Sequence, residues 1–304
     1  MMSTTSYTIE ELASILKVSK LTVYDLIKKG TLPAYRVGRQ MRVDEEDLTD
    51  YKNQTKNVVT SQKQEKKQKT RPVVISGQDV SLDLLSKSLE GELSQTPLRL
   101  YNGSLNSLID LYHGKCDIVS LHLYDGESDT YNLPYVKRLL VNDAYVVIHL
   151  VKRTAGLYVQ KGNPHNIQCF KDIAEKDIKM VNRERGAGAR VLLDEKLKQL
   201  GLSASHISGY HNIVTTHLAA ASAVSSGKAD VGIGIENVAR MSDVEFIPLI
   251  EEQYDLVLLK QERTEEIIAS IKKILSSESF QQQLLSLNGY KTDQTGEVLY
   301  ESIL

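Results

Sequence analysis

The sequence predicts a protein of two parts: a small, mainly α N-terminal domain that ends in a hairpin and a short helix, and a larger α/β C-terminal domain. Two observations predict this division. Residues 53–71 consist mainly of Lys, Gln, Thr and Ser, and only Val58 and Val59 among them are apolar. From Pro72 onward, strand-like apolar runs alternate with helix-like runs, which is typical of an α/β fold with a mainly parallel sheet. The length of 304 residues suits two or three domains.

Composition excludes several classes of protein. Cys116 and Cys169 are the two cysteines of the sequence, so a disulfide framework and a cysteine-based zinc cluster are excluded. The first residues lack the pattern of a secretory signal, and no stretch approaches the roughly 18 apolar residues of a membrane helix. These features predict a soluble, cytoplasmic protein with no membrane partner.

Charge is distributed unevenly along the chain. Residues 1–71 carry 14 Lys and Arg against 9 Asp and Glu, a net charge of +5, whereas residues 72–304 carry a net charge of −7. A basic N-terminal part on an acidic remainder indicates that only the N-terminal part meets a polyanion.

The N-terminal domain begins with two helix signals. Thr8 and Glu11 have the spacing of a capping box that starts a first helix. Ser19 is a good N-cap for a second helix over 20–29, and Gly30 is placed to end it. The short connection between the two helices predicts a helix-turn-helix.

A hairpin follows the second helix. Two short alternating strands flank Gly38 within residues 32–43, and Asp44 is placed to cap a closing helix over 45–52. The domain boundaries predicted from this pattern are 1–52 for the helix-turn-helix domain, 53–71 for a polar, basic linker, and 72–304 for the C-terminal domain.

The run from Tyr7 to Arg39 resembles the excisionase-type winged helix, which is related to the MerR domains. The resemblance implies that the second helix enters the major groove of double-stranded DNA and that the wing contacts the backbone or the minor groove. Asp25 departs from the family, which often has a basic residue there. A small protein-interaction module is the alternative. The candidate DNA-contacting residues are Lys20, Thr22, Tyr24, Lys28, Arg36, Arg39 and Arg42.

Small polar residues recur in the C-terminal domain where strand-like runs end. Ligands of open α/β sheets sit at the carboxyl ends of strands, and helix N-termini there can hold an anion. Four such turns predict a site for one small oxyanion, with no metal or cofactor. The alternatives are helix caps, surface salt bridges and a packed histidine. The candidate ligand-contacting residues are Ser76, Asn102, Ser104, Arg185, Gly186, Gly188, Arg190, Thr216 and His217.

Five runs in this domain resemble the cytoplasmic periplasmic-binding-protein-like domain: 122–132, 162–164, 182–194, 216–221 and 227–234. That family is distantly similar to molybdate- and tungstate-binding proteins and also occurs fused to molybdopterin biosynthesis proteins. The resemblance covers about residues 72–304. It implies a type II fold of two lobes and suggests molybdate or tungstate as the ligand. Ala189 stands where the family commonly has Thr, which keeps other small anions open.

Two lobes imply two chain crossings. We expect lobe one to contain residues 72–150 and the chain after Tyr254, and lobe two to contain roughly 155–250. The crossings, 145–159 and 252–258, would then act as hinges. His122 and Asp125 are expected to shape the wall between the lobes.

Signals for catalysis are weak. The sequence lacks a nucleophile elbow and a phosphate-binding loop, and its histidines lack the i, i+4 spacing of a metal pair. We therefore predict a binding protein, not an enzyme. The favoured hypothesis is a ligand-responsive transcription regulator that acts as a homodimer. The alternatives are an enzyme with a targeting module, and an architectural or excision factor with a passive body.

Overall fold

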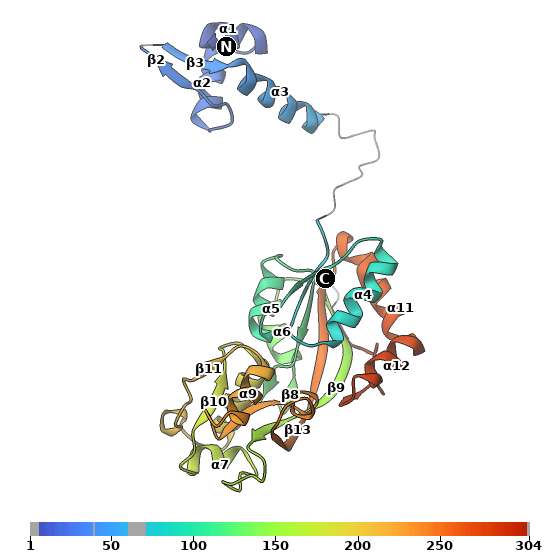
Figure 1. The fold of residues 1–304 in the computed structure, drawn as a ribbon. Helices are drawn as coiled ribbons and strands as arrows, with labels where there is room; N and C mark the ends of the chain where they lie inside the picture. The colour runs from blue at the N-terminus through green and yellow to red at the C-terminus, as the bar shows by residue number, and fades with distance from the viewer. Residues whose placement is uncertain (1–5, 39, 60–70, 303–304) are drawn as a thin grey trace. The chain divides into compact units, whose positions relative to one another are not determined.

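The computed structural model describes residues 6–38, 40–59 and 71–302 (Figure 1). Contacts divide the chain into two units, residues 1–70 and residues 71–304. We call the first unit the head and the second unit the body, and we describe each by itself.

The two predicted helices of the head are present, with the predicted caps. Helix α1 (Ile9–Leu16) begins with a capping box between Thr8 and Glu11, and helix α2 (Lys20–Lys28) is capped by the Ser19 side chain. Gly30 follows with a φ of +70°, a conformation that glycine adopts without steric cost. Local chemistry alone therefore determines where these helices begin and end.

The wing is a three-stranded antiparallel sheet. The predicted hairpin is formed by β2 (Tyr35–Val37) and β3 (Gln40–Asp44), and β1 (Ser6–Thr8) pairs with the other edge of β3. Strand β1 was not predicted, because three residues are too few for a periodic pattern. The head core combines both helices with the wing and consists of Ile9, Leu12, Ala13, Val23, Leu32, Val43 and Leu48.

The closing helix of the head is longer than predicted. Helix α3 (Glu45–Val59) continues seven residues beyond the predicted end at Lys52, so the linker prediction is wrong over 53–59. No glycine or proline interrupts residues 45–59, so their composition is compatible with a helix as well as with a linker. The rest of the predicted linker, 60–70, lies outside the described residues.

Lobe one of the body is built on three parallel strands. Strand β4 (Val74–Ser76) lies between β5 (Leu98–Leu100) and β6 (Ile118–Leu121). The helices of this lobe are α4 (Ser81–Leu93), α5 (Ser104–Tyr112), α6 (Leu133–Leu139), α11 (Glu265–Leu275) and α12 (Glu278–Ser286), with a 3₁₀ turn at Glu262–Thr264.

Lobe two also contains parallel strands. Strand β10 (Met180–Arg183) lies between β11 (Ile213–Val214) and β12 (Val231–Ile235). The helices of this lobe are α7 (Phe170–Glu175), α8 (Gly188–Gln199), α9 (His217–Ser225) and α10 (Glu236–Arg240), with a 3₁₀ turn at Ala204–His206.

Two long strands connect the lobes, as Figure 1 shows. Strands β9 (Tyr145–Val159) and β13 (Glu245–Leu259) pair with each other along their whole length, antiparallel. Strand β9 also pairs antiparallel with β12 in lobe two, and β13 also pairs antiparallel with β6 in lobe one. The prediction of a mainly parallel sheet is therefore wrong: each lobe has a parallel half, and the crossing strands make the sheet mixed.

Residues near the C-terminus complete the sheet of lobe one. Strands β14 (Tyr290–Lys291) and β15 (Val298–Glu301) both pair with β9. Buried apolar side chains form two clusters on the lobe-one side of the crossing and two on the lobe-two side.

A hairpin from lobe one inserts into lobe two. Strands β7 (Tyr124–Asp125) and β8 (Thr130–Tyr131) lie between β6 and α6 in the sequence, yet Tyr124 is buried in a core cluster of lobe two. The backbone N–H of Gly126 donates a hydrogen bond to Glu195 of α8, at 3.2 Å. The predicted boundary of lobe one is therefore wrong for this hairpin, which forms a third link between the lobes.

The close approach of β9 and β13 generates a prediction. A Cβ added at Gly156 would lie 2.1 Å from the carbonyl oxygen of Ile247, a backbone atom that cannot rotate away. We expect Gly156→Ala to destabilise the body by roughly 1–3 kcal/mol, as overpacking does. Gly91→Ala in α4 is the matched control, because a Cβ there meets nothing within 4 Å. Helix propensity should make that variant neutral or more stable by up to about 1 kcal/mol. Denaturant unfolding measures the free energy of unfolding of the wild type and of both variants. Equal changes in Gly156→Ala and Gly91→Ala would contradict the prediction.

Candidate functional site

Two of the four predicted turns meet between the lobes. The backbone N–H of Leu105, which opens α5 in lobe one, donates a 2.9 Å hydrogen bond to the carbonyl oxygen of Gly186 in lobe two. A Cβ added at Gly103 would lie 2.9 Å from the backbone nitrogen of Ala187. The lobes are therefore in backbone contact at the predicted anion site.

The space that remains between these two turns is small. It measures about 10 Å³, which suits about one water molecule and not a tetrahedral oxyanion. The residues that line it are Gly77, Gln78, Asn102, Gly103, Ser104, Ser120, His122, Arg183, Ala187, Gly188 and Tyr254.

Two side chains occupy the place between the turns. The His122 ring lies against Gly188, where an added Cβ would come within 2.4 Å of the ring. Arg183, at the end of β10, donates hydrogen bonds to the Gln78 side chain at 2.6 Å and to the Thr215 carbonyl at 2.9 Å. The contact between Arg183 and Gln78 joins lobe two to lobe one.

The polar side chains predicted to bind the anion have partners within the body. The Ser76 hydroxyl shares a 2.8 Å hydrogen bond with Ser107, and the Asn102 amide donates to Asp110 at 2.8 Å. The Ser104 hydroxyl accepts from the backbone N–H of His122 at 3.3 Å, and the Thr216 hydroxyl caps α9. In this arrangement each of these groups serves the fold.

The predicted arginines lie elsewhere. Arg190 pairs with Asp194 at 3.1 Å on the same helix and stacks over the Tyr210 ring at 3.9 Å. Arg185 is exposed and is not among the residues that line the described cavities. At this strand end the arginine that faces the cleft is Arg183, which sequence reasoning missed. Arg183 ends the buried strand β10, and ligands of α/β sheets sit at the carboxyl ends of strands.

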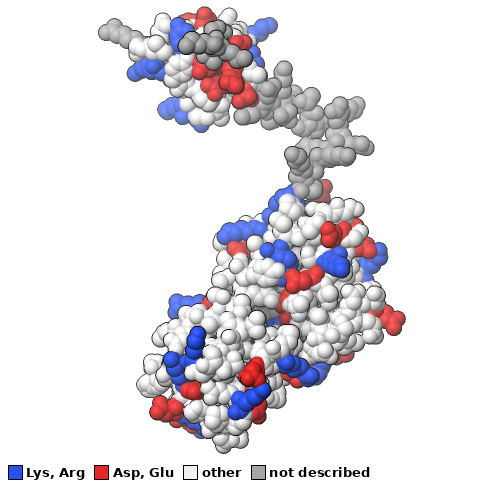
Figure 2. All heavy atoms as spheres, in the orientation of Figure 1, with Lys and Arg blue, Asp and Glu red and all other residues white. Residues whose placement is uncertain are grey.

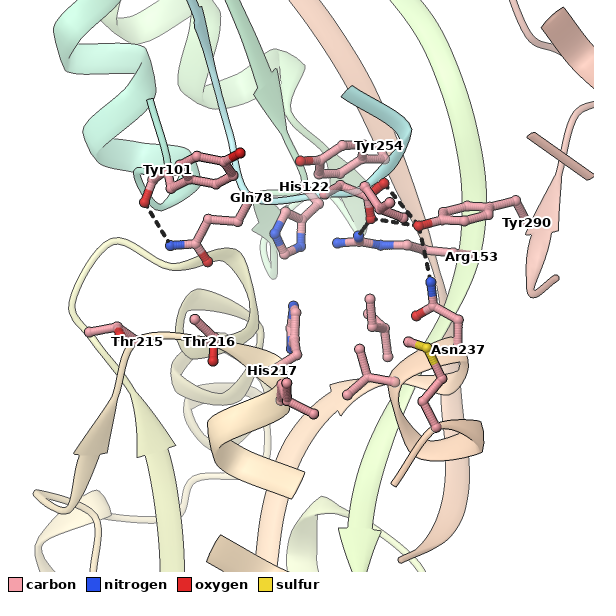
Figure 3. A pocket seen from close by; sticks show the side chains of 16 residues that line it. Gln78, Tyr101, His122, Arg153, Thr215, Thr216, His217, Asn237, Tyr254 and Tyr290 are labelled. Carbon is pink, nitrogen blue, oxygen red and sulfur yellow. Dashed lines mark hydrogen bonds and ion pairs between the residues drawn. The ribbon is translucent and has the colours of Figure 1, made fainter. Parts of the chain in front are cut away.

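A larger cavity, about 390 Å³, opens beside the small one (Figure 3). Lobe one supplies the Gln78–Val80 segment, Tyr101 and His122, and lobe two supplies the first turns of α9 and α10. Of the predicted ligand residues, it takes in Thr216 and His217. Its lining comprises Gln78, Asp79, Val80, Tyr101, His122, Arg153, Thr215, Thr216, His217, Leu218, Ile235, Asn237, Val238, Met241, Tyr254 and Tyr290.

A buried ion cluster forms the floor of this cavity. Arg153 on β9 pairs with Glu252 directly opposite on β13, at 2.5 Å, and with Asp79 ahead of α4. His122 Nδ1 lies 3.1 Å from the other oxygen of Glu252 and donates to it, because a carboxylate only accepts. Burial alone would raise the pKa of Glu252, but Arg153 and His122 outweigh burial and hold this pKa well below its ordinary value.

A chain of hydrogen bonds crosses the cavity wall from lobe to lobe. The Tyr290 hydroxyl donates to Asp79 at 2.9 Å and accepts from the side-chain amide of Asn237 at 3.1 Å, as Figure 3 shows. Asp79 belongs to lobe one and Asn237 to lobe two. Tyr290, Arg153 and Asn237 were not predicted, because their roles depend on contacts between segments far apart in the sequence.

Two polar atoms on the lobe-two wall are buried without a hydrogen-bond partner in the described structure. They are Nδ1 of His217 and the side-chain oxygen of Asn237. Burial, reinforced by the nearby charges of Arg183 and Arg153, lowers the pKa of His217 well below its usual value. His217 is therefore neutral at pH 7, and both unpartnered atoms belong to residues that line the larger cavity.

No group of metal-ligating side chains suited to a metal ion is found among the described residues. Within the same residues, no helix is long and apolar enough to cross a membrane. Asp125, which was expected on the wall between the lobes, instead stabilises the inserted hairpin by accepting hydrogen bonds from Ser128.

The head presents most of its predicted DNA-contacting residues to solvent. Lys20, Thr22, Tyr24 and Lys28 on α2 are exposed, as is Arg36 on the wing. Figure 2 shows basic side chains at several edges of the head and acidic side chains gathered on one side. Exposure at these positions is what a DNA-contacting surface requires.

Three head residues need separate mention. Arg42 is half-buried and donates to the backbone oxygen of Ser6 at 3.3 Å and to its hydroxyl at 3.1 Å, so it joins β3 to β1. Lys20 pairs with Glu10 at 2.7 Å, an exposed pair of little energetic weight that DNA can displace. Arg39 lies outside the described residues.

The ion cluster generates a prediction about stability and pH. Arg153→Met leaves the carboxylates of Asp79 and Glu252 buried without their cation, which should cost about 3–5 kcal/mol at neutral pH. In the wild type, the lowered pKa of Glu252 gives stability that is present above its ordinary pKa and lost as pH falls through the folded-state value. In the variant, burial of Glu252 is no longer offset by Arg153, so the pKa of Glu252 should rise. Acid should then neutralise this carboxyl and reduce the stability that the variant loses relative to the wild type.

Denaturant unfolding of the wild type and of Arg153→Met, at neutral pH and near pH 5, measures how the difference in their free energies of unfolding changes with pH. Lys273→Met is the matched control, because Lys273 is exposed and pairs with Glu92 on the surface. It should change stability by no more than about 1 kcal/mol. A deficit in Arg153→Met that stays constant with pH would show that the cluster contributes only packing.

Comparison with known proteins agrees with this architecture. Residues 87–276 match a PBP superfamily domain, and residues 6–56 match a helix-turn-helix domain. The YvgK protein of Bacillus subtilis (strain 168) is 58% identical over 310 residues, which cover 99% of this chain and all of that protein. Both families are binding folds and not enzymes, in agreement with the sequence prediction.

Solved structures show the same fold at low sequence identity. PhnD1 from Prochlorococcus marinus (MIT 9301), in complex with methylphosphonate, is 17% identical with a TM-score of 0.50, over 74% of this chain and 94% of that one. A histidine kinase sensor domain similar to periplasmic binding proteins is 10% identical with a TM-score of 0.50, over 72% of this chain and 97% of that one. The chain belongs to the PBP superfamily and carries a helix-turn-helix domain of the excisionase type ahead of its two-lobed binding domain.

Proposed function

We propose that this protein is a one-component transcription regulator: the head binds double-stranded DNA, and the body senses a small ligand between its lobes. The observation that carries the proposal is the union, in one chain, of a DNA-binding fold and a cleft whose two walls belong to different lobes. A ligand that touches both walls favours one lobe arrangement by its differential affinity for that arrangement.

The sequence resemblance makes molybdate or tungstate a candidate ligand. Either oxyanion would require the turns at Gly103 and Ala187 to separate, because the space between them is about 10 Å³. The larger cavity needs no such opening. The proposed function therefore holds for either location of the ligand, and binding measurements decide between them.

We also propose that the protein acts as a homodimer. One helix-turn-helix reads only a few base pairs, and paired half-sites are the usual way to gain specificity. Sedimentation of the full chain, alone and with DNA, tests this. A single species near 34 kDa under both conditions would exclude a dimer.

The wing provides a prediction about DNA affinity. Arg36→Ala should weaken binding to any duplex and reduce the slope of log K against log salt by about one, because one phosphate contact is lost. Fluorescence anisotropy over a range of salt concentrations measures both quantities. Arg240→Ala is the matched control, since Arg240 is equally a surface arginine but lies on α10 of the body. Equal slopes of log K against log salt for the wild type and Arg36→Ala would show that Arg36 makes no phosphate contact.

Coupling between ligand and DNA is the central test. The DNA affinity of the full chain is measured on duplexes from the region upstream of its own gene, with and without each compound that raises its melting temperature. We expect a change of about 5- to 150-fold, the usual range of coupling between two sites. Unchanged DNA affinity in the presence of a bound ligand would contradict the regulator and favour an architectural or excision factor with a passive body.

A further inference from the structure

We propose that the larger cavity binds a small organic molecule that is uncharged or cationic, has a ring or branched apolar body, and carries an N–H or O–H donor, in place of an inorganic oxyanion. The inference rests on the proposed function in one respect: both place the ligand between the lobes. It adds the chemical class of the ligand, which follows from size, apolar lining, charge and unpartnered polar atoms.

Size and apolar lining come first. The cavity, at about 390 Å³, lies within the range of sites for organic ligands, and it opens beside a space that holds no more than about one water. Exposed apolar side chains gather on both of its walls. Val80 and Tyr101 on lobe one are 43% and 62% exposed, and Leu218 and Met241 on lobe two are 60% and 75% exposed. Covering them would remove apolar surface from water, which an inorganic anion cannot do.

Charge argues against an anion. Arg153, the cation of the cavity floor, is already paired with two carboxylates, Asp79 and Glu252. Arg183, beside the small cavity, pairs with Glu184 at 3.0 Å. An anion here would approach buried carboxylates without a cation of its own, and burial of an unpaired charge is costly.

The positive ends of the helices at the cavity do not make it favourable for an anion. The Asp79 carboxylate accepts the first backbone N–H of α4, from Ser81 at 2.7 Å, so this positive end already faces a negative charge. At the start of α9, the Thr216 hydroxyl accepts the N–H of Ala219 at 3.0 Å, and the His217 that follows is neutral. Uncharged and cationic molecules suit these surroundings.

Unpartnered atoms define the hydrogen bonds. The Asn237 amide nitrogen donates to Tyr290 at 3.1 Å, which fixes the amide and leaves its buried oxygen as an unpartnered acceptor on the cavity wall. Neutral His217, whose buried Nδ1 is also unpartnered, extends from the same wall, as Figure 3 shows. A ligand donor that reaches the Asn237 oxygen satisfies a group that otherwise remains buried and unpaired.

The test uses the full-length chain and eight compounds. Adenine, adenosine, cytidine, nicotinamide and tryptamine represent the proposed class, whereas molybdate, tungstate and phosphate represent oxyanions. Thermal shift identifies binders, and calorimetric titration gives their affinities. We expect at least one organic compound to bind, and Asn237→Leu to weaken it at least tenfold.

Two further variants keep the result interpretable. His217→Phe removes the second polar group without touching Tyr290, so it tests the same wall if Asn237→Leu fails to fold. Gln282→Leu, an amide removed from the exposed surface of α12, is the matched control and should bind as the wild type does.

The outcomes separate the two proposals. Binding of oxyanions alone, or of none of the eight compounds, overturns the proposed ligand class and leaves the regulator to be judged by DNA coupling. Unchanged organic binding in both Asn237→Leu and His217→Phe overturns the placement of the ligand. An organic compound that binds as expected but leaves DNA affinity unchanged supports this inference and contradicts the regulator.

Discussion

The ion pair between Arg153 and Glu252 is the constraint on which the body depends. The two residues face each other where β9 and β13 pass from one lobe to the other. Both are buried, so each would carry a large desolvation cost without the other. The pair also reaches into lobe one, because Arg153 contacts Asp79 ahead of α4 and Glu252 accepts from His122 after β6. The crossing strands and the lobe-one wall of the cleft are thus positioned by one charge cluster.

The lobes are held together differently on the two sides of this cluster. Beside the small cavity, backbone contacts between Leu105 and Gly186 and the hydrogen bond between Arg183 and Gln78 close the gap. Beside the larger cavity, side chains join the two walls: Tyr290 lies between Asp79 and Asn237, and Arg183 lies between Gln78 and the Thr215 carbonyl. Two of the turns that sequence reasoning selected, at Gly103 and Gly186, therefore lie where the lobes meet, and the larger cavity lies next to them.

Sequence reasoning succeeds where a structural feature depends on neighbouring residues. The caps at Thr8 and Ser19 are examples, because each cap side chain bonds to a backbone N–H only three residues later. It fails where partners are distant: Arg153 meets Glu252 across 99 residues, and Tyr290 meets Asp79 across 211. The rule that ligands sit at the carboxyl ends of strands pointed to loops that meet between the lobes. It could not choose between Arg183, which turns toward the cleft, and Arg190, which pairs with Asp194.

The inserted hairpin restricts how the lobes can move and so where a ligand can act. A protein joined by two crossing strands alone can open freely about them, but here residues 124–131 of lobe one are packed into lobe two beside α8. Separation of the turns at Gly103 and Ala187 must break backbone contacts, whereas a molecule in the larger cavity meets both walls without breaking them. It can then act through the groups that span the crossing, namely Tyr290 and the cluster around Arg153. A ligand can favour one arrangement of the lobes only if it contacts atoms of both lobes. The larger cavity offers such contacts, because Tyr101 of lobe one lines one wall and Asn237 of lobe two lines the other.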